Sequence, residues 1–199
     1  MKFIGITGGV GAGKSEILAY LKKKPDTRVM LADEIAHELM EQGTDCYEKI
    51  RRQFSGEDIF LPRGGFDRGK LAAVIFSDEE KRMQMNAIVH PAVKDYVRKT
   101  AVEEREKGEL EYLFLEAALL IEEHYDEICD ELWYIYTKED VRRQRLMASR
   151  GYSGEKVQQI FASQLKEAEY RSHCQFILDN NGAVEETYRQ LDRRLGVAP

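Results

Sequence analysis

Residues 8–15 read Gly8-Gly9-Val10-Gly11-Ala12-Gly13-Lys14-Ser15. An apolar and β-branched run, Lys2 to Thr7, comes directly before them, and apolar residues at helical spacing follow from Lys14 onward. The pattern G-x-x-x-x-G-K-[ST] binds phosphate when it connects a strand to a helix. Its glycines let successive backbone N–H groups face one anion, and the helix N-terminus adds partial positive charge. The sequence therefore predicts a strand, a phosphate-binding loop and a helix, in that order.

The side chains of this loop have distinct expected tasks. Lys14 supplies a full positive charge to the phosphates, and Ser15 can offer its hydroxyl to a Mg²⁺ ion that bridges them. Glu16 puts a carboxylate beside the loop, but its backbone N–H can still donate while its side chain points outward. The alternative, a chance glycine-rich turn, is disfavoured by the flanking strand and helix. The residues expected to bind ATP here are Gly8, Gly9, Gly11, Ala12, Gly13, Lys14, Ser15 and Glu16.

Length and composition favour a compact globular protein. The chain has 199 residues, of which 43% are hydrophobic and 33% are charged. A net charge of −6 argues against a general nucleic-acid surface. We also expect no membrane contact and no obligate protein partner. The three cysteines are an odd number without C-x-x-C spacing, which suits a reducing compartment, so we expect a cytoplasmic protein.

Strand-like and helix-like segments alternate along the chain, which predicts an α/β fold with a parallel sheet. The segment from 34 to 107 has helical patterns only, broken at Leu61-Pro62-Arg63-Gly64-Gly65 and at His90-Pro91. It is expected to be a helical insertion. The other expected strands are Arg28 to Leu31, Tyr112 to Leu115, Leu132 to Tyr136 and Phe176 to Leu178, and the later helices are Glu139 to Ser149, Gly154 to Ala168 and Val184 to Leu195.

Asp33 is the leading candidate for chemistry. It follows the second expected strand, and in parallel sheets the carboxyl ends of the strands face the crevice where ligands bind. A carboxylate there can accept the proton of an attacking hydroxyl, or hold Mg²⁺ through water. The alternative is an N-cap, because Asp33 precedes the helical run Glu34-Ile35-Ala36.

Four arginines lie within nine residues of an otherwise acidic chain: Arg142, Arg143, Arg145 and Arg150. Such a cluster can clamp a transferring phosphoryl group. The alternative is a solvated helix face with side-chain pairs three and four residues apart. We expect at least one of these arginines to contact phosphate.

Other polar residues allow two interpretations. His90 precedes Pro91, which favours extended backbone and a structural role at a helix boundary. The remaining histidines share no ligand spacing, so a metal cluster is not expected. Glu116 and Glu122 flank the apolar run 117–121 and could bind a ligand or cap a helix.

The ordered set of motifs resembles the dephospho-CoA kinase family over nearly the whole chain. Members use ATP to phosphorylate the ribose 3′-hydroxyl of dephospho-CoA, which gives coenzyme A and ADP in the last step of coenzyme A biosynthesis. The features that carry the resemblance are Ile6 to Ser15; Ala32-Asp33 with Ile35-Ala36-His37; His90-Pro91-Ala92-Val93; Leu119-Leu120-Ile121-Glu122; Gln144-Arg145-Leu146-Met147; Gln164; and Asp179-Asn180-Asn181-Gly182.

This resemblance implies a P-loop NTPase-type fold with three α/β/α layers, a parallel sheet, a helical substrate-binding insertion and a helical lid. The nucleotide core would comprise 1–33, 111–137 and 174–199, the dephospho-CoA insertion 34–110 and the lid 138–173. The resemblance implies catalytic roles for Asp33 as the base and for Lys14, Arg142 and Arg145. Asn180 and Gly182 would lie by the adenine, and Asp33, His90 and Glu122 would contact the acceptor.

The chain departs from the family pattern at the lid. Ser149 stands where the family usually has arginine, and Arg150 follows one residue later, so Arg142, Arg145 and Arg150 all stay candidates for the phosphate contact. Three other functions are compatible with a phosphate-binding loop: a kinase of a nucleoside monophosphate or sugar, a nucleotide-dependent switch, and an inactive nucleotide-binding relative. The helical insertion disfavours the first. The absence of an N-K-x-D signature disfavours a GTPase, and Asp33 with Lys14 and Ser15 disfavours an inactive protein.

Overall fold

The computed structural model describes residues 1–196, and these form two compact units. The sheet unit comprises Met1–Met30 and the chain from Glu104 onward; the helical unit comprises Leu31–Glu103. The segment expected as the lid, 138–173, belongs to the sheet unit. The elements of the sheet unit are β1 (Lys2–Thr7), α1 (Lys14–Leu21), β2 (Thr27–Leu31), β3 (Tyr112–Glu116), η1 (Tyr125–Glu127), β4 (Glu131–Tyr136), α6 (Glu139–Arg150), α7 (Gly154–Ala162), α8 (Glu167–His173), β5 (Phe176–Asp179) and α9 (Val184–Leu195).

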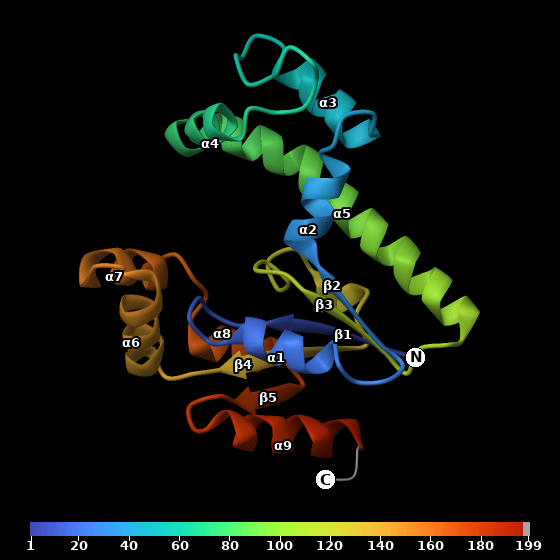
Figure 1. Ribbon diagram of the computed structural model, residues 1–199, viewed down its shortest axis with the longest axis vertical. Helices are drawn as coiled ribbons and strands as arrows, with labels where there is room; N and C mark the ends of the chain where they lie inside the picture. Colours follow the sequence, from blue (N-terminus) through green and yellow to red (C-terminus); the bar gives the residue numbers. More distant parts are fainter. Residues whose placement is uncertain (197–199) are drawn as a thin grey trace. The chain divides into compact units, whose positions relative to one another are not determined.

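Five strands form one sheet in the order β2-β3-β1-β4-β5 (Figure 1). β1 lies at the centre and pairs in parallel with β3, where Ile4 faces Phe114, and with β4, where Ile6 faces Trp133. β1 is buried from Phe3 to Thr7 without alternation, as expected of a strand covered on both faces. The α/β class with a parallel sheet is confirmed.

Helices cover both faces of the sheet. On one face Tyr134 of β4 stacks on Tyr170 of α8, with ring centroids 4.6 Å apart. On the other face the Arg194 guanidinium of α9 lies 5.9 Å from the Trp133 ring. α1 joins α9 through the stacked rings of Tyr20 and Tyr188, 3.8 Å apart. Because Trp133 and Tyr134 point to opposite faces of β4, the layers are helix, sheet and helix.

The Gln190 side chain of α9 hydrogen-bonds to the backbone at the free edge of β5, at Asp179. The Asp179 N–H donates to Oε1 of Gln190 at 3.1 Å, and Nε2 of Gln190 donates to the Asp179 carbonyl at 2.9 Å. The Gln190 amide therefore makes the two hydrogen bonds that a neighbouring strand would make at this residue.

A partly buried carboxylate, Glu131, links the first strand to the last helix. Glu131, at the start of β4, accepts hydrogen bonds from Lys2 at 2.9 Å, from the Trp133 ring at 2.9 Å and from Arg194 at 2.5 Å. Burial works to raise the pKa of Glu131, but the hydrogen bonds from Trp133, Lys2 and Arg194 outweigh it and lower the pKa from 4.5 to about 2.

Glu131→Gln should lower the free energy of unfolding by about 1–3 kcal/mol at neutral pH, measured by chemical denaturation. The folded-state pKa lies below the unfolded value, so the unfolded chain binds the proton more readily. The contribution of Glu131 is therefore complete above pH 4.5 and is lost as the pH falls toward 2. The exposed Glu109→Gln variant is the control. A stability difference that stayed constant as the pH fell would contradict this account.

The helical unit contains α2 (Ala32–Leu39), α3 (Asp45–Gln53), α4 (Arg68–Ser77) and most of α5 (Glu79–Lys107). α3 begins at a Thr44 N-cap whose hydroxyl accepts from the Tyr47 N–H, and α4 begins at an Asp67 N-cap. Tyr47 packs against the rings of Phe60 and Phe66. No helix within residues 1–196 is long and apolar enough to cross a membrane.

The expected break at His90-Pro91 is wrong. Both residues lie inside α5, which continues without interruption to Lys107. Met85, Val89, Val93 and Val97 are buried at intervals of four residues along this helix. Burial of four apolar side chains, at roughly 1.5–3 kcal/mol each, outweighs the cost of about 3 kcal/mol for an interior proline. His90 is therefore helical rather than extended.

The expected helix from Gly154 to Ala168 is also wrong, because the chain forms two helices there. α7 ends at Ala162, where the Ser163 hydroxyl donates to the Ile160 carbonyl. α8 begins after Lys166, whose N–H donates to the Glu169 carboxylate at 2.9 Å. Local capping hydrogen bonds end one helix and start the next, although apolar residues at helical spacing, Val157, Phe161 and Leu165, continue across the break.

Candidate active site

The glycine loop between β1 and α1 has a backbone that only glycine adopts readily. The φ angles of Gly8, Gly11 and Gly13 are 152°, 83° and 89°. A Cβ atom at Gly8 would lie 2.8 Å from the carbonyl oxygen of Ile135 in β4. α1 begins directly after Gly13, and no side chain caps it, as required for an anion site at a helix N-terminus.

Lys14 lies at the mouth of this loop. Its ammonium group donates to the Gly8 carbonyl at 2.6 Å and lies 3.7 Å from a carboxylate oxygen of Glu116. Glu116 ends β3, the strand beside β1, so the sheet itself brings the two charges together. The cation therefore stands over the loop, next to an acidic side chain.

Ser15 and Glu16 form the first turn of α1, and both are exposed. The Glu16 carboxylate accepts a hydrogen bond from the Tyr188 hydroxyl of α9, and this bond together with burial raises the pKa of Tyr188 to about 12. The side chain is thus held by α9, in agreement with the expectation that it points outward. The Ser15 hydroxyl has no side-chain neighbour that fixes it in the described structure.

Polar side chains hold the back of the loop. The Ala12 carbonyl accepts from the Asn180 amide at 2.7 Å and from the Thr137 hydroxyl at 3.1 Å. Arg145 donates to the Asn180 carbonyl at 2.9 Å, and the Thr187 hydroxyl donates to the Asn180 side-chain oxygen at 2.9 Å. Asn180 is buried, so its side chain is committed to positioning the loop. Gly182, two residues further along the chain, is exposed.

The side chain of Arg142, from α6, packs against the loop at Gly9 and Val10. Its Nε donates to the Val10 carbonyl at 2.9 Å, and its Nη2 donates to the side-chain oxygen of Gln164. The guanidinium leaves no room for a Cβ atom at Gly9, and its Cζ lies 4.4 Å from the centre of the Phe161 ring. Of the expected arginines, this one contacts the loop at Gly9 and Val10.

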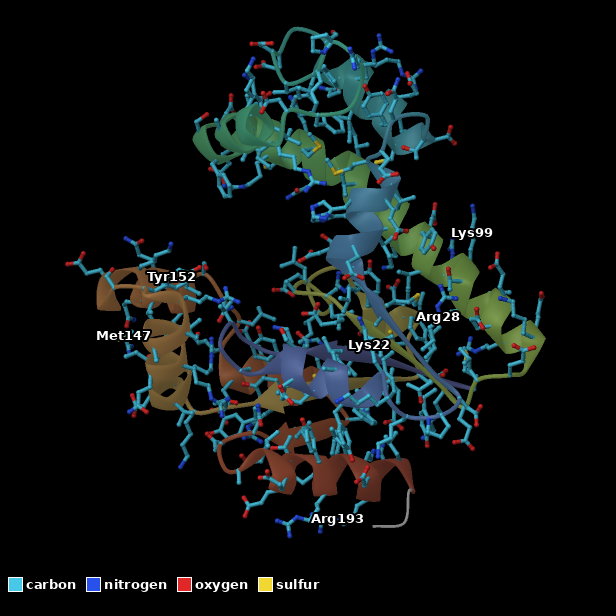
Figure 2. All side chains as sticks on the ribbon, in the orientation of Figure 1. Lys22, Arg28, Lys99, Met147, Tyr152 and Arg193 are labelled. Carbon is cyan, nitrogen blue, oxygen red and sulfur yellow. The ribbon has the colours of Figure 1, made fainter. Side chains whose placement is uncertain are left out.

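The other two arginines of the cluster face elsewhere. Arg143 pairs with Glu139 at 3.0 Å and with Gln158 at 2.9 Å. Arg150, at the end of α6, lies 6.0 Å from the Tyr152 ring. Figure 2 shows Tyr152 together with Met147 on the α6–α7 pair. Neither of these arginines bonds to the loop, so the surface interpretation applies to them.

The cap interpretation of Glu116 and Glu122 is wrong, since residues 117–124 form a turn and not a helix. Glu116 faces Lys14 instead. Glu122 is exposed; burial first, and the charge of Glu122 second, raise the pKa of Tyr170 to about 12. His90 lies in α5 of the helical unit.

Asp33 lies in the first turn of α2, in the helical unit. It is not the N-cap, because Leu31 occupies that position and the Asp33 side chain caps nothing. Its carboxylate is exposed and has no hydrogen bond or ion pair with any residue from 1 to 196. An unpaired carboxylate of this kind is available to a ligand.

Asp33 lines a pocket of about 800 Å³ within the helical unit. Apolar side chains form much of the wall, among them Leu61, Phe66, Leu71 and Met85. Polar side chains join Asp33 in the lining; they include His37, Arg68 and Asn86. A largely apolar hollow with a few polar groups is typical of a site for an organic ligand.

The described residues contain no group of three or more histidine, cysteine, aspartate or glutamate side chains that could hold a metal ion. Mg²⁺ does not need one, since it keeps several waters and takes one or two protein oxygens plus phosphate oxygens. The exposed Ser15 hydroxyl at the start of α1 is a suitable single ligand. The residues present therefore fit a magnesium ion that arrives with a nucleotide.

Two features of this site escaped the sequence prediction. The pairing of Lys14 with Glu116 depends on β3 lying beside β1, and no local pattern carries the strand order. The contact of Gln164 with Arg142 and Val10 joins residues more than twenty positions apart. The family resemblance includes Gln164, but no pattern in the sequence gives its partners.

A parallel sheet, a glycine loop after its central strand, and a lysine and an arginine at that loop together define a P-loop kinase. The sequence model of the dephospho-CoA kinase family matches residues 2–186. The chain belongs to this family. Its members phosphorylate dephospho-CoA to coenzyme A, and the predicted family, reaction and enzyme class are confirmed.

Curated relatives agree over nearly their full length. The dephospho-CoA kinase of Geobacter sulfurreducens is 35% identical over 192 residues, which is 96% of this chain and 96% of the relative. That of Oceanobacillus iheyensis is 36% identical over 192 residues, 96% of this chain and 95% of the relative.

Solved structures show the same fold. A Thermus thermophilus protein is 31% identical, with a TM-score of 0.75 over 98% of this chain and 96% of that chain. A shikimate kinase from Acinetobacter baumannii is 14% identical, with a TM-score of 0.54 over 98% of this chain and 94% of that chain. This second likeness concerns the fold alone.

Proposed function

We propose that the protein transfers the γ-phosphate of Mg²⁺-ATP to the ribose 3′-hydroxyl of dephospho-CoA, with Asp33 as the base and with Lys14 and Arg142 on the phosphates. The observation that carries the proposal is the loop site, where Lys14 and Arg142 stand at one glycine-rich backbone turn. The family match over residues 2–186 supports dephospho-CoA as the acceptor.

On the nucleotide side, backbone N–H groups of the glycine loop and of the first turn of α1 bind the phosphates, apart from those of Val10 and Ala12, which donate to Gln164 and to the Gly9 carbonyl. Lys14 exchanges its contact with the Gly8 carbonyl for a phosphate oxygen, and the nearby Glu116 limits the charge left behind when the nucleotide departs. Arg145 and Asn180 keep the back of the loop in shape through the Ala12 carbonyl. Gly182, which is exposed, is then available to the adenine.

Magnesium would be held by the Ser15 hydroxyl together with phosphate oxygens and water. When bound, it neutralises charge on the phosphates. Catalysis by this chain is then mainly the positioning of donor and acceptor, with cationic side chains facing the charge of the transition state.

On the acceptor side, the pocket of the helical unit is the proposed dephospho-CoA site. The apolar wall around Leu71 and Met85 suits the long arm of the acceptor, and Arg68 suits its diphosphate. Asp33 shares this pocket, so the base and the acceptor hydroxyl belong to one unit. In the transfer, the 3′-oxygen forms a bond to the γ-phosphorus, the bond to the β–γ bridging oxygen breaks, and Asp33 takes the hydroxyl proton. His90 and Glu122 stay secondary candidates for acceptor contacts.

The direct test is a product assay by mass. Purified protein is incubated with Mg²⁺-ATP and, separately, dephospho-CoA, AMP, CMP, gluconate and shikimate. Equal amounts of coenzyme A and ADP, with no phosphorylation of the other compounds, are expected. Phosphate transfer to a different acceptor, or nucleotide binding without transfer, would overturn the proposal.

The pocket itself is tested by a bulky substitution. Ala72 lines the pocket, whereas its neighbour Ala73 is exposed on the same helix. Ala72→Trp should raise the KM for dephospho-CoA at least about tenfold, because an indole fills space that the ligand needs, and should leave the KM for ATP unchanged. Ala73→Trp is the matched control and should leave both unchanged. Equal effects of the two variants would exclude this pocket as the acceptor site.

The cytoplasmic location is also proposed. All three cysteines are buried, and Cys129 and Cys174 belong to the same unit without forming a disulfide. Buried cysteines outside disulfides suit a reducing compartment. Cell fractionation with an antibody to the protein tests the location, and recovery outside the cytoplasmic fraction would contradict it.

A further inference from the structure

Gln164 lies in the short segment that joins α7 to α8, where the expected helix is interrupted. Its backbone N–H donates to the Phe161 carbonyl at 3.3 Å, which fixes this residue at the end of α7. The Gln164 side chain extends from the end of α7 to the glycine loop of the sheet unit. Both partners described below lie in that same unit.

The side-chain oxygen of Gln164 accepts two hydrogen bonds at once. One comes from Nη2 of Arg142, and the other comes from the Val10 N–H of the loop, at 3.3 Å. Arg142 in turn donates from Nε to the Val10 carbonyl at 2.9 Å. Val10, Arg142 and Gln164 therefore form a closed ring of three hydrogen bonds, in which each member contacts the other two.

This ring leaves Arg142 with donors to spare. A guanidinium has five N–H groups, and Arg142 uses one at Nε and one at Nη2. The remaining three N–H groups, two on Nη1 and one on Nη2, make no hydrogen bond to residues 1–196. Two hydrogen bonds within the protein fix the position of the Arg142 guanidinium. The three remaining N–H groups can then donate to phosphate.

The aromatic side chain of Phe161 completes the support. The Arg142 Cζ lies 4.4 Å from the Phe161 ring centre, at a distance typical of cation–π contact. Phe161 and Gln164, which are three residues apart, thus both contact the Arg142 guanidinium. A long and flexible arginine side chain is confined in this way before any nucleotide arrives.

We infer that Gln164 is a positioning residue for phosphoryl transfer, which sets the orientation of Arg142 toward the γ-phosphate and couples it to the loop through Val10. The inference rests on the proposed function, because it requires Arg142 to act on phosphate. In this assignment Gln164 acts through Arg142 and needs no contact of its own with either substrate. Its effect should therefore depend entirely on the presence of Arg142.

The test is a double-mutant cycle on the purified full-length protein, with coenzyme A formation as the readout. Gln164→Ala should lower kcat about 10- to 100-fold through misplacement of the guanidinium, while the KM for dephospho-CoA stays unchanged. Arg142→Ala should lower kcat at least as much. In the double variant, removal of Gln164 should cause no further loss, because the group that it orients is already gone.

Gln158→Ala is the matched control. Gln158 also accepts a hydrogen bond from a lid arginine, Arg143, at 2.9 Å, but it does not reach the loop. This variant should keep wild-type kcat. The melting temperature of every variant is measured, so that a folding defect is recognised independently of the kinetics.

Three results would overturn the inference: an unchanged kcat in Gln164→Ala, an equal loss in Gln158→Ala, or a full further loss when Gln164→Ala is added to Arg142→Ala. If the wild-type protein made no coenzyme A, the proposed function would fail first, and that result is visible before any variant is compared. If the wild-type protein is active and the kcat losses of Gln164→Ala and Arg142→Ala are additive, only the positioning role of Gln164 is excluded.

Discussion

Asp33→Asn should lower the turnover number for coenzyme A formation by about 10²–10⁴-fold, the range that general base catalysis contributes. Asparagine keeps the size and the first-turn position of this side chain in α2, but it cannot take the proton of the 3′-hydroxyl. The Asp33 carboxylate has no partner within residues 1–196, so its replacement breaks no ion pair. The affinity for ATP, measured by calorimetry, should change less than about twofold.

Glu34→Gln is the control for this variant. Glu34 is the next residue, lies in the same first turn and is exposed, but it does not line the pocket. It removes the same charge from the same helix end, so any effect of the helix dipole appears in both variants. Near wild-type turnover in Asp33→Asn would exclude this carboxylate as the base.

Lys14→Ala should lower kcat/KM for ATP by on the order of 10³-fold, equivalent to about 4 kcal/mol of transition-state stabilisation. The variant loses the charge that faces the phosphates, and it leaves the Glu116 carboxylate beside the loop without its neighbour at 3.7 Å. Both losses disfavour an incoming polyanion, so the dissociation constant for ATP should rise together with the fall in turnover.

Lys22→Ala is the matched control, since Lys22 is an exposed lysine at the other end of α1 (Figure 2). It should have wild-type kinetics. A second comparison adds Glu116→Gln to Lys14→Ala, which should recover part of the lost ATP affinity because the repulsion is removed. Unchanged kinetics in Lys14→Ala would exclude the glycine loop as the phosphate site.

The parts of the fold that rest on contiguous sequence could be predicted. Lys2 to Ser15 contains a strand, a glycine loop and a helix start in one run, and the structure has all three there. The order of the strands and the continuity of α5 could not be predicted, because they depend on distant contacts. Pro91 is a local signal for a break, whereas the burial of Val89 and Val93 that overrides it is tertiary.

The candidate site divides in the same way. Lys14, Ser15 and Asp33 follow from residue type and place along the chain. Which arginine meets the loop does not, because Arg142 and Arg143 are adjacent in sequence and α6 alone turns the first toward Val10 and the second toward Gln158. The contacts of Gln164 with Arg142 and Val10 could not be predicted from the sequence, since Gln164 lies more than twenty positions beyond both residues.

The amide of Gln190 at the free edge of β5 bears on how copies of this protein behave when crowded. An unpaired strand edge offers hydrogen bonds to any extended segment of a second molecule, and sheets can grow into aggregates from such an edge. At Asp179 both backbone groups are already satisfied from within the chain. At this residue the edge of β5 therefore has no backbone group left to pair with a strand of a second molecule.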